Sequence, residues 1–184
     1  MRTVPRQSIA TVFRLVSLAS VVAVPIFGVG QAAHDHAAPA KLVQIVRAAT
    51  QQYIDVNNAS PDYVPLFGCV SGPDHGAMGI HYVNVSLLNG QIDASHPQAL
   101  IYEPIGNARR LVGVEYIVDA PTWLADKSHQ GLPPQLEGQA FQLVGTPNRY
   151  GIPSPFFELH VWAWRDNPNG AFVDWNNKVS CEGE

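Results

Sequence analysis

Charged residues are scarce in this chain of 184 residues. They make up 14% of the sequence, against about 25% in ordinary soluble domains, and the formal net charge is −4. Such a chain lacks the basic surface that nucleic-acid binding requires, so nucleic acid is excluded as a partner. The hydrophobic fraction of 46% is nevertheless that of a folded protein, which argues for one globular domain.

Recognisable catalytic motifs are also missing. The sequence contains no GxSxG nucleophile elbow, no phosphate-binding glycine loop, no HExxH helix and no dinucleotide fingerprint. Serine-hydrolase and nucleotide chemistry are therefore not expected.

Only one apolar run approaches the length of a membrane span, and it lies at the N-terminus. Leu15 to Val29 follows a basic start with Arg2, Arg6 and Arg14, and small residues follow it. The run is shorter than the roughly 20 residues that a span needs, which favours a secretory signal over residues 1–32, with an uncleaved anchor as the alternative. We expect a flexible tail over 33–40, a single domain over 41–184, and export to the periplasm or the medium, with no membrane contact after cleavage.

Cysteine is nearly absent. Cys69 and Cys181 are the only two, and they do not form a CxxC motif. In an exported protein an even cysteine count predicts a disulfide, and a redox or metal role is the weaker alternative.

The new N-terminus carries two histidines whose chemistry depends on the cleavage site. Cleavage after Ala33 would place a free amine on His34, with His36 in the third position, an arrangement that could bind Cu(II) or Ni(II). Otherwise this segment is an ordinary tail.

The domain itself is predicted to contain one helix followed by strands. Residues 41–55 repeat apolar positions with helical spacing, and β-branched and aromatic residues dominate 79–88, 99–104, 110–119, 139–145 and 156–164. Short, turn-rich connections favour antiparallel pairing. We therefore expect an α+β fold: a curved, mainly antiparallel sheet of about five strands, barrel-like or half-barrel, with one long N-terminal helix packed on it.

Four of these strands each carry an ionisable residue among apolar neighbours: His81, Glu103, Glu115 and His160. Residues two apart in a strand share a face, and on the last strand this face also holds Glu158, Trp162 and Trp164. A carboxylate within a hydrophobic strand needs solvent, a cation or a proton. If the faces converge, the four residues form a site for Zn, Fe, Mn or Cu, which His75 in a preceding loop could also reach. Glu115 or Glu103 would then be the candidate general base.

Several segments resemble a family of exported bacterial proteins that are mainly described as hypothetical proteins. They include HYVN, YEP, GVEY and LHVW, together with ATQQY at the start of the domain. The similarity covers about residues 42–181 and implies export, but no activity.

These observations favour an exported protein with an internal His/Glu site for a divalent metal, which makes it a candidate metal-dependent enzyme for a small organic molecule. One alternative is a metal-free binding module in which Trp162, Trp164 and the carboxylates form the wall of a small-molecule pocket. The other is an envelope protein that binds a partner through a sheet edge.

Overall fold

The computed structural model describes residues 39–72 and 74–184. The expected signal peptide, His34, His36 and most of the expected tail lie outside these residues. Within them, no helix has the length and apolar character needed to cross a bilayer.

The first helix, α1 (Lys41–Thr50), is anchored by one apolar side. Leu42, Val43 and Val46 are buried in the core that the helix shares with the sheet; the helical spacing predicts this for Leu42 and Val46 but not for Val43. The helix ends after ten residues, where the backbone tightens into the 3₁₀ turns η1 (Gln51–Ile54) and η2 (Val56–Ala59). Asp55 is extended between these turns, and its carboxylate accepts a hydrogen bond from the backbone N–H of Asn57.

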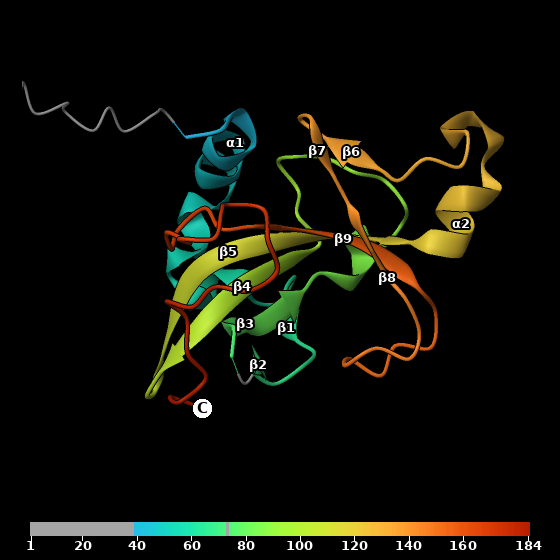
Figure 1. The fold of residues 1–184 in the computed structure, drawn as a ribbon. Helices are drawn as coiled ribbons and strands as arrows, with labels where there is room; N and C mark the ends of the chain where they lie inside the picture. Colours follow the sequence, from blue (N-terminus) through green and yellow to red (C-terminus); the bar gives the residue numbers. More distant parts are fainter. Residues whose placement is uncertain (1–38, 73) are drawn as a thin grey trace, which may run out of the picture. The chain divides into compact units, whose positions relative to one another are not determined.

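The strands form one open antiparallel sheet in the order β1-β3-β4-β5-β9-β8, with β2 also paired to β3. Figure 1 shows long, curved β4 and β5 beside each other in this sheet. The sheet strands are β1 (Val64–Pro65), β2 (Val70–Gly72), β3 (Gly76–Val83), β4 (Ala99–Ile105), β5 (Ala108–Asp119), β8 (Gln142–Val144) and β9 (Phe156–Val161). The remaining elements are η3 (Val85–Leu87), α2 (Ala120–Ala125), η4 (Lys127–His129) and the separate hairpin of β6 (Gln135–Leu136) and β7 (Gln139–Ala140).

The predicted architecture was wrong in three respects. The N-terminal helix is short, because apolar spacing over 41–55 does not distinguish an α-helix from the 3₁₀ turns that follow it. Within the described residues the sheet has seven strands instead of about five, because β1 and β2 are too short to show an alternating pattern. It is also not closed into a barrel, since β1 and β8 lie at opposite ends of the strand order.

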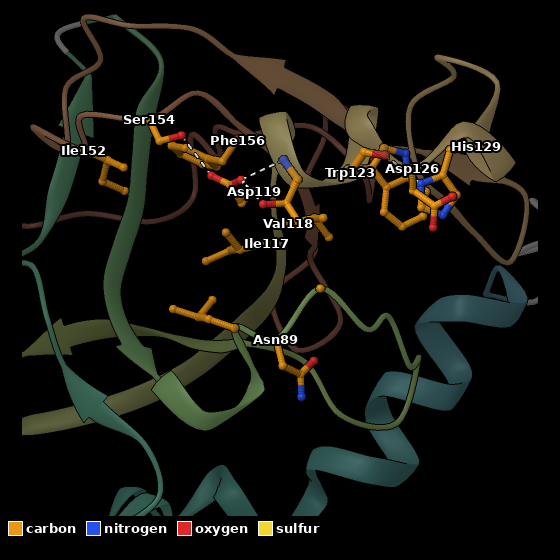
Figure 2. A pocket seen from close by; sticks show the side chains of 13 residues that line it. Asn89, Ile117, Val118, Asp119, Trp123, Asp126, His129, Ile152, Ser154 and Phe156 are labelled. Atoms are coloured by element: carbon orange, nitrogen blue, oxygen red, sulfur yellow. Dashed lines mark hydrogen bonds between the residues drawn. The ribbon is translucent and has the colours of Figure 1, made fainter.

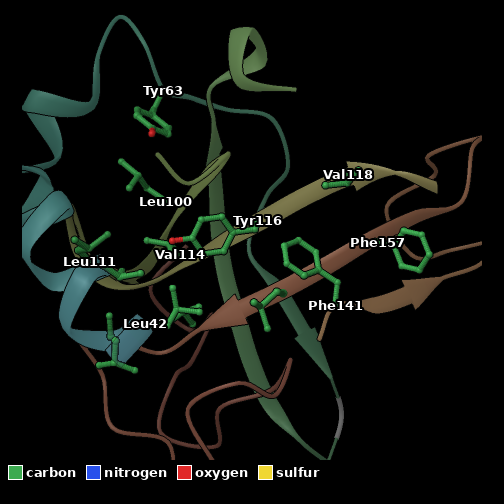
Figure 3. Packing of buried hydrophobic residues seen from close by; sticks show 14 of the residues in the cluster. Leu42, Tyr63, Leu100, Leu111, Val114, Tyr116, Val118, Phe141 and Phe157 are labelled. Atoms are coloured by element: carbon green, nitrogen blue, oxygen red, sulfur yellow. The ribbon is translucent and has the colours of Figure 1, made fainter. Parts of the chain in front are cut away.

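The two faces of the sheet are covered differently. One face packs against α1 and contains most of the buried apolar side chains, including Leu100, Val114 and Tyr116 (Figure 3). On the other face, the C-terminal segment contributes Val179 to a smaller cluster with Ile101 and Trp162. The ionisable residues that the sequence singles out lie on the strands between these two layers.

A β-bulge interrupts the alternation of side-chain faces along β5. Ile101 pairs with Gly113, whereas Tyr102 pairs with Leu111, so Val112 is the extra residue. Consequently Leu111 joins the core on the α1 face and Val112 joins the smaller cluster, the reverse of the faces that unbroken alternation from Glu115 predicts.

Gly113 lies where β5 and the end of β9 approach closely. A Cβ atom at this position would be 2.7 Å from the carbonyl oxygen of Val161. Gly113→Ala is therefore expected to lower the free energy of unfolding by about 1–3 kcal/mol, as measured by urea denaturation. Gly145→Ala is the matched control, because no atom would lie within 4 Å of its Cβ. Equal stability of the two variants would contradict this interpretation.

Candidate metal centre

Strand register brings three of the predicted residues together. Glu115 on β5 is directly opposite His160 on β9 and, on its other side, opposite Ala99 on β4. His81 on β3 pairs with Ile101, two residues along β4 from Ala99. Because a cross-strand pair shares one face, all these side chains lie on the same side of the sheet. The small Ala99 leaves room for His81 and Glu115 to meet across β4.

The resulting cluster of His81, Glu115 and His160 is called the inner site. Each residue offers a possible ligand atom, and these atoms all lie within 4.8 Å of one another. Nε2 of His81 is 3.4 Å from Oε2 of Glu115, and the two imidazole centroids are 5.9 Å apart. All three residues are at most 3% exposed. The structure therefore contains buried His and Glu groups that could bind a metal.

The ring nitrogens of the inner-site imidazoles lack hydrogen-bond partners among the residues that the structure describes. Both ring nitrogens of His81 and both of His160 are buried without a hydrogen-bond partner. Buried polar atoms in folded proteins nearly always have a partner, and an unpaired one costs about 1–3 kcal/mol. Four such atoms in one small cluster are difficult to explain by a purely structural role.

Burial favours the uncharged form of each group. It lowers the pKa of His81 to about 4, and burial together with the neighbouring His81 lowers the pKa of His160 well below its usual range. Burial and the nearby Glu158 carboxylate raise the pKa of Glu115 well above its usual range. Neutral imidazoles are ready to bind a metal, whereas Glu115 must lose its proton, so protons and metal compete for this residue.

Two further acidic residues adjoin this cluster. Glu158, His160 and Asp174 form a second group whose ligand atoms lie within 4.8 Å of one another, which is called the outer site. Glu158 lies two residues before His160 on β9, so strand alternation places both side chains on the same face. The sequence analysis predicts this shared face but does not predict Glu158 as a metal ligand. Asp174 lies in the irregular C-terminal segment, where the sequence gives no positional signal.

Glu103 and His75 were predicted to join the site, and the structure places neither there. Glu103 is four residues along β4 from Ala99, a distance of roughly 13 Å. Its carboxylate accepts a hydrogen bond from the backbone N–H of Ser180 and lies 3.5 Å from Arg110, so it also does not serve as a base at this site. His75 is exposed in the turn before β3.

Trp162 and Trp164 line none of the cavities at the inner and outer sites, so they do not form the predicted pocket wall there. Trp162 lies beyond the end of β9 but keeps the face of His160, with ring centroids 6.3 Å apart, whereas Trp164 packs against the core on the α1 side. The indole of Trp162 is buried and donates to the carbonyl of Val173, whereas the indole of Trp164 donates to the hydroxyl of Thr50 on α1. The two rings thus attach to different segments.

The predicted disulfide between Cys69 and Cys181 is confirmed. It joins the segment before β2 to the C-terminal segment, which also holds Asp174. The side-chain carboxylate of Glu184 accepts a hydrogen bond from the backbone N–H of Cys69 at 2.7 Å.

In the described part of the chain, two cavities border the inner and outer sites and a third adjoins one of them. One of about 20 Å³, room for a single water molecule or ion, is lined by His81, Glu115 and Tyr150 among others. A second, of about 420 Å³, is lined by residues 143–150 and reaches Glu158 and Asp174 of the outer site.

The third cavity is a mostly apolar cleft of about 520 Å³ (Figure 2). Trp123 stacks on His129 at one end, with ring centroids 3.5 Å apart, and Asp119 accepts a hydrogen bond from Ser154 at 2.8 Å. Three side chains line both this cleft and the small cavity at the inner site: Ile117, Ile152 and Phe156.

Comparisons of the chain with protein-family models, with curated proteins and with solved structures found no match, so the case for a function rests on the geometry of the inner and outer sites.

Proposed function

We propose that this protein is exported and binds a divalent transition-metal ion through His81, Glu115 and His160. The observation that carries the proposal is the set of four buried imidazole nitrogens without hydrogen-bond partners, within a cluster that also contains a carboxylate. A coordinated ion would give a nitrogen of each ring a partner. Export is supported by the disulfide, which persists in oxidising compartments.

The donor set indicates the kind of ion. Two imidazoles and one carboxylate suit Zn²⁺, Fe²⁺ or Mn²⁺, and three protein ligands leave coordination positions open. An ion held in this way could act as a Lewis acid toward a bound molecule.

A small organic molecule is the proposed substrate. The cleft in Figure 2 is separated from the cavity at His81 and Glu115 by the shared side chains of Ile117, Ile152 and Phe156. Its mostly apolar walls favour a molecule with an apolar body. The same cleft is the observation that favours the alternative function, a metal-free binding module.

Glu115→Gln tests the inner site. The substitution keeps the shape and neutrality of the protonated side chain but removes the carboxylate that would bind a cation. We expect it to weaken Zn²⁺ binding at this site by at least about 100-fold, because even the loss of an outer-shell partner costs about 10- to 100-fold. Calorimetric titration of protein stripped with a chelator measures this affinity.

Glu103→Gln is the matched control, because Glu103 is also a strand glutamate but is held by Arg110 and Ser180. It should leave the affinity within about twofold of the parent protein. If both variants bind Zn²⁺ as the parent does, Glu115 is not a ligand. A parent protein that takes up no metal would favour the metal-free binding module.

A further inference from the structure

His160 belongs to both the inner and the outer site. Its Nδ1 atom is 3.7 Å from Oδ1 of Asp174, which assigns this nitrogen to the outer site. The other nitrogen, Nε2, is buried and also has no hydrogen-bond partner. An imidazole has two ring nitrogens, so a second potential ligand atom remains beside the Nδ1 atom that lies near Asp174.

The outer site has its own unpartnered ligand atom. Oε2 of Glu158 is buried without a hydrogen-bond partner, and Glu158 is only 2% exposed. Asp174 is oriented by Gln142, whose Nε2 donates to Oδ1 at 2.9 Å. Two carboxylates and an imidazole nitrogen are thus available next to His81 and Glu115, and the Glu158 carboxylate lies close to that of Glu115.

Access also differs between the two sites. The outer site borders the cavity of about 420 Å³, and the side chain of Asp174 remains 25% exposed. The inner site borders a cavity with room for only one small ligand. Arg149 lines the larger cavity and lies over the ring of Trp175. Its guanidinium group places a positive charge in the cavity that Glu158 and Asp174 also line.

We propose that the protein binds two divalent ions, bridged by the imidazole of His160. This inference rests on the proposed function and extends it. The inner ion is bound by His81, Glu115 and Nε2 of His160, and the outer ion by Glu158, Asp174 and Nδ1 of His160. Bridging requires the ring to release its remaining N–H proton to solvent, and the two positive ions stabilise the resulting imidazolate.

Stoichiometry tests the bridge. The full protein, with its disulfide intact, is stripped with a chelator, titrated with Zn²⁺ and examined by native mass spectrometry. The parent protein should bind two ions. Asp174→Asn should bind one, because the amide keeps an oxygen for the hydrogen bond from Gln142 but lacks the charge that binds the outer ion. Glu158→Gln should also bind one ion, which provides a second test should the first variant fold poorly.

Asp166→Asn is the control, since Asp166 lies in the same C-terminal segment but is exposed and paired with Lys178. It should retain two ions. Exactly one ion in the parent protein overturns the bridge while leaving the inner site in place. If the parent protein binds one ion and both Asp174→Asn and Glu115→Gln lose it, a single ion is shared by all five residues, and the two-ion proposal is overturned. A parent protein without any ion overturns the proposed function itself.

Discussion

Replacing His160 by alanine is expected to abolish stoichiometric metal binding, because this ring contributes to both the inner and the outer site. Removing Asp174 or Glu115 leaves one group of three ligands intact, whereas removing His160 leaves two ligands in each. Elemental analysis of the purified variant after equilibration with Zn²⁺ measures the loss. A variant that keeps its full metal content would exclude His160 from the ligands.

Stability separates a ligand histidine from a structural one. In the metal-free protein, His160→Ala creates a cavity but also removes two buried nitrogens that have no partner. These effects oppose each other and are each a few kcal/mol, so the net change should be small. The parent protein should gain about 2.7 kcal/mol from Zn²⁺ at 100 times the dissociation constant, and the variant should gain nothing. A large loss of stability without metal would instead indicate a structural role.

Loss of the disulfide is expected to have the largest effect on stability. Cys69 and Cys181 are separated by 112 residues, and closing a loop of about 100 residues contributes roughly 4–5 kcal/mol in the chain-entropy model. The double variant Cys69→Ser, Cys181→Ser should therefore unfold at a clearly lower urea concentration. The outer site should also weaken more than the inner one, because Asp174 lies in the C-terminal segment that this bond fastens.

Ser71→Ala provides the comparison for the double variant, since Ser71 is exposed on β2 near the disulfide. It should unfold at nearly the same urea concentration as the parent protein. A double variant that matches Ser71→Ala would show that packing of the C-terminal segment, with Val179 against Trp162 and Ile101, is sufficient without the bond.

The alternation of polar and apolar residues was informative where strands are long and regular. It placed His81, Glu115 and His160 on faces that do converge. It could not give their positions along the strands, which is why Glu103 shares the expected face yet lies roughly 13 Å away. Alternation failed where the strand itself changed: at the bulge that contains Val112, and beyond the end of β9, where Trp164 packs on the α1 side and not beside His160.

Other features had no local signal at all. The strands β1 and β2 contain only two and three residues, so no period could be detected. Asp174 occupies an irregular segment whose path is set by contacts with the rest of the fold, including the bridge between Asn176 and Ala77. Composition and residue spacing do not predict where such residues lie in the fold, because contacts between residues distant in sequence determine their positions.

By itself, the sequence determined an antiparallel α+β domain, the pairing of its two cysteines and the presence of ionisable residues inside apolar strands. These properties follow from residue chemistry and from the two-residue period of a strand, both of which are local. Only the tertiary structure decided which of those residues meet, because register between strands that are distant in sequence selected Glu115 over Glu103 and added Glu158 and Asp174 around His160.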